Sequence, residues 1–130
     1  MMAKQPENED ELSIVGGTKK GLSPARQEEI QAEFLAAAND GNDPVLYHAL
    51  AFGADINKPD KRTGLTALHL AIGRNAFDAV KLLVLRGAAF VPDNLGRMPS
   101  VIAAECEVSE ELCDFVVEAE AAAEATAEGV

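Results

Sequence analysis

The sequence predicts an all-α fold, a solenoid of about three helix-turn-helix repeats in which the first and last repeats act as caps. Residues 63–87 carry the clearest copy of the unit, because they read as two short helices joined by a tight turn. Glycines mark its period, since Gly53 and Gly87 lie 34 residues apart and Gly64 and Gly96 lie 32 apart. Self-similarity at a period near 33 residues is typical of stacked helical repeats.

The first repeat is expected over residues 24–59. Ser23 and Pro24 make a strong helix start, because serine accepts a bond from a free backbone N–H and proline suits the first helical position. This helix is expected to end near Asn39, and a second helix is expected to begin at Asp43. Polar residues lengthen the start of the first helix, as an N-terminal cap requires. Its apolar residues share one broad face: Ile30, Phe34, Leu35 and Ala38.

The central repeat is expected over residues 60–92, with helices at residues 67–73 and 77–85. Isolated helices shorter than roughly 12–15 residues are marginal in water, so packing must stabilise both. Apolar residues cover a wide arc of the second helix, which indicates neighbours on both of its flanks. Gly87 supplies the left-handed residue that ends a helix, and Gly53 has the same place one repeat earlier.

The third repeat is expected over residues 93–118 and closes the stack. Pro99 is predicted to start its first helix, and Ser109 is predicted to cap its second helix. Glutamates on the second helix alternate with inward-facing apolar residues at helical spacing. They give the polar outer face that a terminal repeat needs.

Tails are expected on both sides of the repeats. Residues 1–22 are polar and interrupted by glycines, which predicts a disordered segment. Inside it, residues 12–15 form an apolar island that either packs loosely on the first repeat or docks on a partner. Residues 119–130 are mainly alanine and glutamate and are expected to be a partly helical tail.

Composition indicates one domain with an aliphatic core. The 130 residues are 48% hydrophobic but only 5% aromatic, and small aliphatic side chains suit closely stacked helices. No apolar run could form a transmembrane helix, and the N-terminus lacks the apolar core of a signal peptide. Cys106 and Cys113 are expected to be reduced residues rather than a disulfide or a metal site. A cytoplasmic location without membrane contact is therefore expected.

Charge is unevenly distributed along this acidic chain, whose net charge is −11. Residues 1–52 carry nine acids and four bases, residues 53–97 carry four acids and seven bases, and residues 98–130 carry nine acids and no base. The acidic ends would repel phosphate, which disfavours nucleic-acid binding. The basic centre suits an acidic docking segment of a protein partner.

Several motifs resemble the ankyrin-repeat family over roughly residues 25–118. They are TALHLA at residues 66–71, AVKLLV at residues 79–84 and GADIN at residues 53–57. The resemblance implies that Thr66 and His69 bond to each other and to the neighbouring loop. It also implies an enlarged first hairpin tip, because the loop around residues 59–62 has one residue more than the family's usual loop.

The resemblance further implies a non-enzymatic module that binds a protein partner through its hairpin tips and the concave face of its first helices. The candidate partner-binding residues, by position, are Lys61, Arg62, Leu65, Leu70, Arg74, Leu95, Arg97, Ile102 and Glu105. Arg62, Arg74 and Arg97 are expected on the same side of neighbouring repeats, where the planar guanidinium group can grip carboxylates. The alternative is that these arginines are ordinary surface charges.

The compact, alanine-rich sequence favours a small stand-alone bacterial protein, monomeric on its own, that acts as an inhibitor, immunity protein or adaptor. The alternative is a secreted effector translocated into a host cell, with the alanine-glutamate tail needed for export. No catalytic residue, metal site or cofactor is expected. No nucleophile elbow stands out, residues 16–20 lack the spacing of a phosphate-binding loop, and His48 is expected at the surface.

Overall fold

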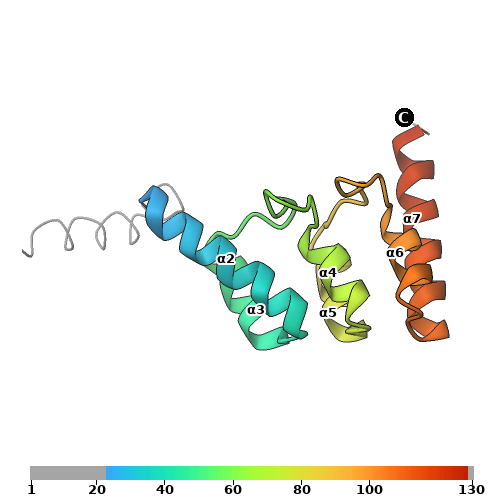
Figure 1. Ribbon diagram of the computed structural model, residues 1–130, viewed down its shortest axis with the longest axis horizontal. Coiled ribbons are helices and arrows are strands. Elements are labelled where there is room, and N and C mark those ends of the chain that lie inside the picture. Colours follow the sequence, from blue (N-terminus) through green and yellow to red (C-terminus); the bar gives the residue numbers. More distant parts are fainter. Residues whose placement is uncertain (1–22, 129–130) are drawn as a thin grey trace, which may run out of the picture.

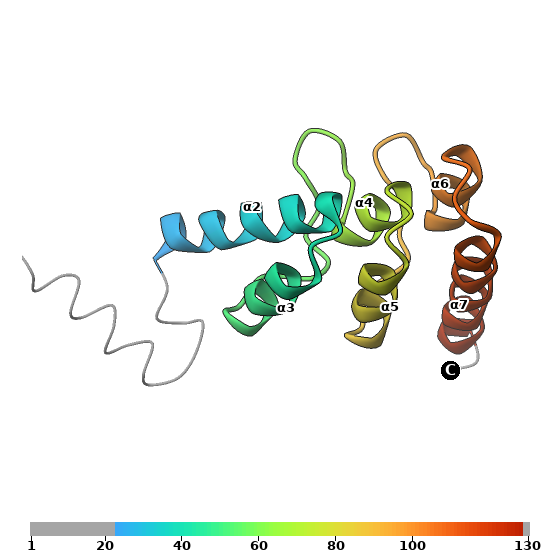
Figure 2. The same ribbon diagram turned by 90° about the horizontal axis from the view of Figure 1, so that it is seen from below.

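The computed structural model describes residues 23–128, which contain six helices and no strand (Figure 1). The helices form three pairs that stand side by side, with the inter-repeat loops projecting from one edge (Figure 2). This arrangement is the predicted all-α solenoid. The pairs are α2 (Pro24–Asp40) with α3 (Asp43–Ala51), α4 (Ala67–Gly73) with α5 (Phe77–Leu85), and α6 (Pro99–Glu105) with α7 (Glu110–Glu128).

The two tails expected from the sequence lie at the ends of the described range, residues 23–128. The N-terminal segment and its apolar island at residues 12–15 lie outside the described residues. At the other end, α7 continues as helix through residues 119–128. The boundaries expected at residues 23 and 118 remain predictions.

Side-chain caps fix where α2 and α3, the two helices of the first pair, begin. The Ser23 hydroxyl accepts the backbone N–H of Arg26 at 3.2 Å, and the Asn42 side chain accepts that of Val45 at 3.3 Å. In the last repeat, Ser109 caps α7 in the same way, through the N–H of Leu112. Such caps satisfy backbone donors that the first turn of a helix leaves free.

Helix α6 receives its cap from a distant part of the chain. Met98 precedes the helix and has no side chain that could accept a hydrogen bond from it. Instead, the Glu120 carboxylate accepts the backbone N–H of Ser100 at 3.0 Å and its hydroxyl at 2.9 Å. The long α7 therefore braces the start of the short helix beside it.

The turns inside the helix pairs use left-handed residues at equivalent places. Asn75 has φ +58°, and Glu107 has φ +53°. Asparagine tolerates this conformation better than most residues, and the Asn75 side chain also accepts the N–H of Ser109 at 3.0 Å. The turn of the central repeat is thereby tied to the start of α7.

The core runs without interruption through the three pairs. Its largest apolar side chains come from every pair: Phe34, Leu46, Leu68, Ile72, Leu83 and Leu112. The Phe77 and Phe115 rings meet edge to face at 5.6 Å and join the second pair to the third. Helices of seven to nine residues are not stable alone, so this shared core is what stabilises them.

We expect Leu83→Ala to lower the free energy of unfolding by about 2–5 kcal/mol, because the Leu83 side chain is 0% exposed between helix pairs. Leu85→Ala is the matched control. It makes the same substitution in the same helix, where the residue is 83% exposed. Urea denaturation of both variants measures the difference. Equal losses would contradict the observed packing of α5.

Candidate protein-interaction site

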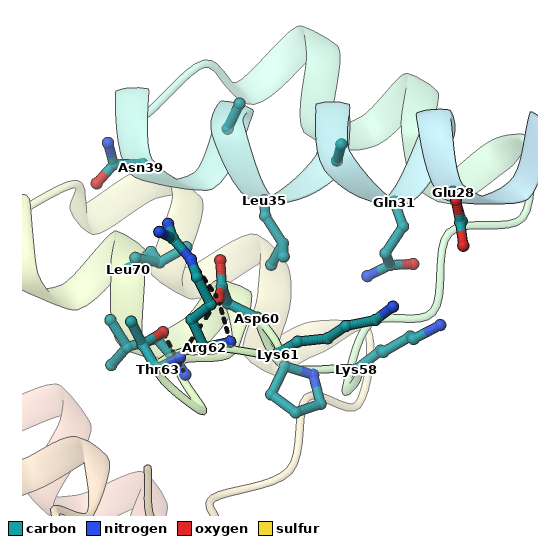
Figure 3. A pocket seen from close by; sticks show the side chains of 14 residues that line it. Glu28, Gln31, Leu35, Asn39, Lys58, Asp60, Lys61, Arg62, Thr63 and Leu70 are labelled. Atoms are coloured by element: carbon teal, nitrogen blue, oxygen red, sulfur yellow. Dashed lines mark hydrogen bonds and ion pairs between the residues drawn. The ribbon is translucent and has the colours of Figure 1, made fainter. Parts of the chain in front are cut away.

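A groove of about 670 Å³ lies between α2 and the loop that follows α3 (Figure 3). Leu35 extends from α2 into the groove, opposite residues 58–65 of the loop. Leu65 and Leu70 line the same space, and all three leucines are half-buried. The groove therefore offers an apolar floor to a bound chain.

Cationic side chains edge this floor. Lys58 and Lys61 are exposed and both line the groove (Figure 3), and the Arg62 side chain is 88% exposed. Asp60 also lines the groove, but its carboxylate accepts the backbone N–H groups of Arg62 at 2.7 Å and Thr63 at 3.3 Å. The loop side of the groove is thus a mainly basic edge beside the apolar floor, whereas the α2 side carries one exposed acid, Glu28.

The first projecting loop is larger than the second. In the first loop the Asp60 N–H donates to the Leu65 carbonyl, whereas in the second the Asp93 N–H donates to the Arg97 carbonyl. The first loop thus encloses one residue more, as the sequence predicts. The extra residue lies within residues 61–64, the stretch that carries two of the basic groups at the groove.

The two loops interlock at Asn94. Its backbone N–H donates to the Thr63 carbonyl at 3.1 Å, and its side-chain amide donates to the Arg62 carbonyl at 3.2 Å. Gly64 has φ +78°, and a methyl group there would lie 2.6 Å from the Asn94 nitrogen. This close approach requires glycine. The second loop therefore holds the backbone that presents Arg62.

Thr66 and His69 bond to each other at the start of α4. The Thr66 N–H donates to Nδ1 of His69 at 3.0 Å, and the His69 N–H donates to the Thr66 hydroxyl at 3.4 Å. Because Nδ1 accepts a hydrogen bond, the neutral ring carries its proton on Nε2. Burial lowers the pKa of His69, because it disfavours the charged imidazolium. The nearby backbone of Arg97 and Val91 raises the pKa, but by less.

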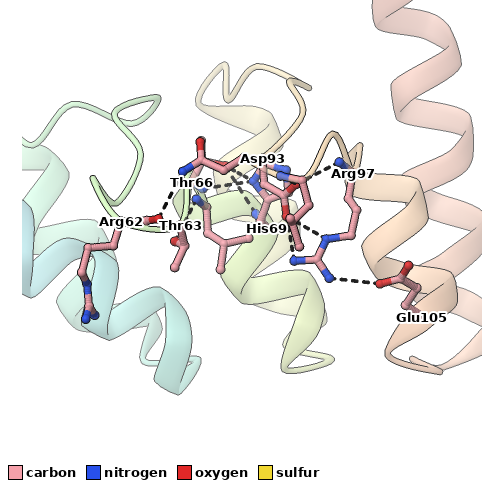
Figure 4. A network of polar contacts seen from close by, with 10 residues as sticks. Arg62, Thr63, Thr66, His69, Asp93, Arg97 and Glu105 are labelled. Atoms are coloured by element: carbon pink, nitrogen blue, oxygen red, sulfur yellow. Dashed lines mark hydrogen bonds and ion pairs between the residues drawn. The ribbon is translucent and has the colours of Figure 1, made fainter.

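Arg97 forms a network with Asp93 and Glu105 (Figure 4). Its guanidinium group lies 2.8 Å from the Asp93 carboxylate and 3.1 Å from that of Glu105. The Asp93 side chain is 1% exposed, and burial alone would raise its pKa. The backbone N–H and the guanidinium of Arg97, with the N–H of Leu95, hold that pKa below its usual value. Arg97 thus compensates a buried charge.

The structure brings together only part of the predicted partner-binding set. Lys61, Arg62, Leu65 and Leu70 line the groove. Leu95 is exposed at the second loop and does not line the groove. These placements leave four of the predicted residues around one concave space.

Other predicted placements are corrected. Ile102 is 5% exposed, so it belongs to the core and is not offered to a partner. Arg74 follows the C-terminal end of α4, whereas the first loop, which carries Arg62, leads into the N-terminal end of this helix. Arg97 and Glu105 form an ion pair with each other at 3.1 Å on the surface, so both charges already have a partner within the chain. The expected strip of Arg62, Arg74 and Arg97 is therefore not continuous.

The α2 wall of the groove was not singled out from the sequence. Its residues are spaced by one, three or four positions along α2 and share one helix face: Glu28, Gln31, Ala32, Leu35, Ala36 and Asn39. The sequence groups Leu35 with Ile30 and Phe34, but those two are buried while Leu35 is only half-buried. This second face of α2, which mixes polar and apolar residues and lies beside the core-facing one, is the sequence signal that could have indicated the wall.

A family profile described as "Ankyrin repeats (3 copies)" matches residues 34–127. The chain belongs to the ankyrin-repeat family. Ankyrin repeats generally mediate protein–protein interaction without catalysis. The loops and first helices that line the groove are, in this family, the surfaces that repeat stacking leaves free to vary.

Two ankyrin-containing relatives are similar to parts of this chain. Neurogenic locus notch homolog protein 1 of Xenopus tropicalis is 35% identical over 105 residues, which cover 78% of this chain and 4% of that protein. Ankyrin repeat and SOCS box protein 6 of Homo sapiens is 40% identical over 70 residues, which cover 54% of this chain and 17% of that protein. Both are vertebrate proteins, so they lend no support to the bacterial origin expected from composition.

Within residues 23–128, no cluster of three or more potential metal ligands occurs, and Cys106 and Cys113 are free. None of the helices described combines the length and apolar character needed to span a membrane.

We expect Gly64→Ala to destabilise the chain more than Gly96→Ala. Both residues have positive φ, +78° and +81°, so each substitution incurs the left-handed strain of about 1–2 kcal/mol. Only at Gly64 does the added methyl group meet Asn94, because the space at Gly96 is open within 4 Å. Urea denaturation compares the pair, and equal losses would show that the loops do not interlock.

We expect stability to fall as the pH drops from about 7.5 to 5.5. The pKa of His69 is lower in the folded chain, so the unfolded chain binds the proton first and protonation favours unfolding. This loss begins near the unfolded pKa of about 6.5, whereas the lowered pKa of Asp93 acts only at more acidic pH.

Denaturation at several pH values measures this loss in the parent and two variants. His69→Gln should be less stable than the parent at neutral pH but should show a flatter dependence on pH. His48→Gln removes the other histidine of the chain and is the matched control. A His69→Gln variant with the parent's slope would assign the pH dependence to other groups.

Proposed function

We propose that this ankyrin-repeat chain binds a segment of a protein partner in the groove between α2 and the first loop, without catalysis. The observation that carries the proposal is a floor of three half-buried leucines beside the exposed side chains of Lys58, Lys61 and Arg62. Apolar side chains gain most by leaving water, and exposed cations at the rim steer and select an anionic partner.

This surface favours a partner segment that combines acidic and apolar residues. The leucine floor would bury its apolar side chains, while Lys61 and Arg62 would meet its carboxylates. The guanidinium group of Arg62 is well suited to that role, because its planar fork can bind a carboxylate with two hydrogen bonds. Nε of this group lies 4.0 Å from the Asp60 carboxylate, but the side chain is 88% exposed, so its two terminal nitrogens face solvent and can bind a partner's carboxylate.

For the biological role, we propose an inhibitor, immunity protein or adaptor. It would act as a monomer in the cytoplasm of a bacterium. These roles share binding without turnover, and alanine-rich composition supports the bacterial setting. The effector alternative required a C-terminal tail that is needed for export and not for folding. Glu120 caps α6 from that tail, which supports a structural role for it instead.

We expect Lys61→Glu/Arg62→Glu to weaken partner binding by about tenfold or more, because two attractive charges become repulsive ones at the groove. The partner is first captured on the immobilised parent chain, and its dissociation constant is then measured by calorimetry. Binding should also weaken as salt concentration rises.

Arg74→Glu/Lys81→Glu is the matched control, since it makes the same change in net charge at exposed positions that do not line the groove. Arg97 is left unchanged, because its loss would leave Asp93 buried and unpaired. If the control loses binding as much as the groove variant does, net charge matters and the groove does not. A groove variant that binds normally would move the site elsewhere.

A further inference from the structure

We propose that residues 9–15 of this chain, Glu-Asp-Glu-Leu-Ser-Ile-Val, occupy the groove of the same molecule and compete with the protein partner. The proposal rests on the function proposed above, because it takes the groove to be a binding surface for an acidic and apolar segment. It makes the chain its own inhibitor, released when a partner segment binds more strongly.

The chemistry of the segment matches the groove. Three consecutive acids, residues 9–11, precede the apolar residues Leu12, Ile14 and Val15. An extended chain would present Leu12 and Ile14 to the same side, since alternate side chains share a face. These two can meet the leucine floor while the acids meet the basic edge.

The similar stretch at residues 110–117 is not available for this purpose. It also combines acids with apolar residues, but its Leu112 and Val116 are buried in the core of the last repeat. Residues 9–15 carry the same chemistry and lie next to the repeats in sequence. They are thus the segment of this chain best placed to fill the groove.

The connecting chain is long enough for this return. Residues 16–22 lie between the segment and Ser23, and seven extended residues span about 23 Å. Leu35 lies 12 residues beyond Ser23 along α2, or about 18 Å at the rise of an α-helix. The connecting residues 16–22 would run along α2 from its start, and the segment at their far end would lie at the leucine floor.

Attachment makes even a weak contact effective. A segment tethered by a short linker has an effective concentration in the millimolar range, so weak affinity suffices to fill the groove. Occupation lowers the apparent affinity for a partner in proportion to the fraction of open grooves. Charge contributes to the contact, so higher salt should open the groove.

A fluorescent synthetic peptide of residues 7–17 tests the proposal against full-length chains. Binding is measured by anisotropy to the parent and to Leu12→Ser/Ile14→Ser, whose own segment lacks its apolar anchors. We expect the serine variant to bind the peptide about tenfold more tightly than the parent does. Adding Lys61→Glu/Arg62→Glu to the serine variant should abolish this binding, whereas adding Arg74→Glu/Lys81→Glu should preserve most of it.

Several outcomes would overturn the proposal, and they separate it from the proposed function. If the peptide binds the parent and the serine variant equally and depends on Lys61 and Arg62, the groove is a binding site that its own segment does not fill. If the peptide binds neither chain, the segment does not fit the groove, while groove-dependent capture of a partner would still support the proposed function.

The remaining alternative is docking between two copies of the chain. Light scattering of the parent should report a monomer over the concentration range of the binding assay. A dimer that dissociates in the serine variant would mean that the segment fills the groove of a second copy. That result would overturn the intramolecular form of the proposal.

Discussion

The interlock between the two projecting loops is the constraint on which the proposed recognition surface depends. Asn94 of the second loop binds the carbonyl groups of Arg62 and Thr63, and this approach is open only because residue 64 is glycine. The first loop carries an extra residue and projects from the stack, where contacts with the second loop fix its backbone. Its basic side chains therefore face α2 because the next repeat holds their backbone.

The helices and their limits were largely predictable, because they depend on local signals. The caps at Ser23 and Ser109 and the left-handed Asn75 act through residues close in sequence. The site was less predictable, because burial and ion pairing depend on distant residues. Ile102 was assigned to the concave face by its position in the repeat, but packing of the last helix pair leaves it only 5% exposed. Arg97 pairs with the Asp93 carboxylate, which the fold buries.

Two buried polar groups show how this small stack tolerates polarity inside it. His69 remains neutral and is fixed by Thr66, whereas Asp93 remains charged and is held by Arg97 and backbone N–H groups. Both are positioned where one repeat meets the next. Hydrogen bonds offset the cost of burying polar groups, although Nε2 of His69 has no hydrogen-bond partner among the described residues. The contacts made by Nδ1 of His69 and by Asp93 reinforce the register between repeats.

The most direct test of the groove as the recognition surface is to locate binding with leucine methyl groups observed by NMR. The peptide of residues 7–17 is added to the Leu12→Ser/Ile14→Ser chain. If the groove is the recognition surface, the largest shift changes occur at Leu35, Leu65 and Leu70, with little change at the exposed Leu85. Changes centred on Leu85 or Leu95, with the three groove leucines unaffected, would show that the peptide binds elsewhere.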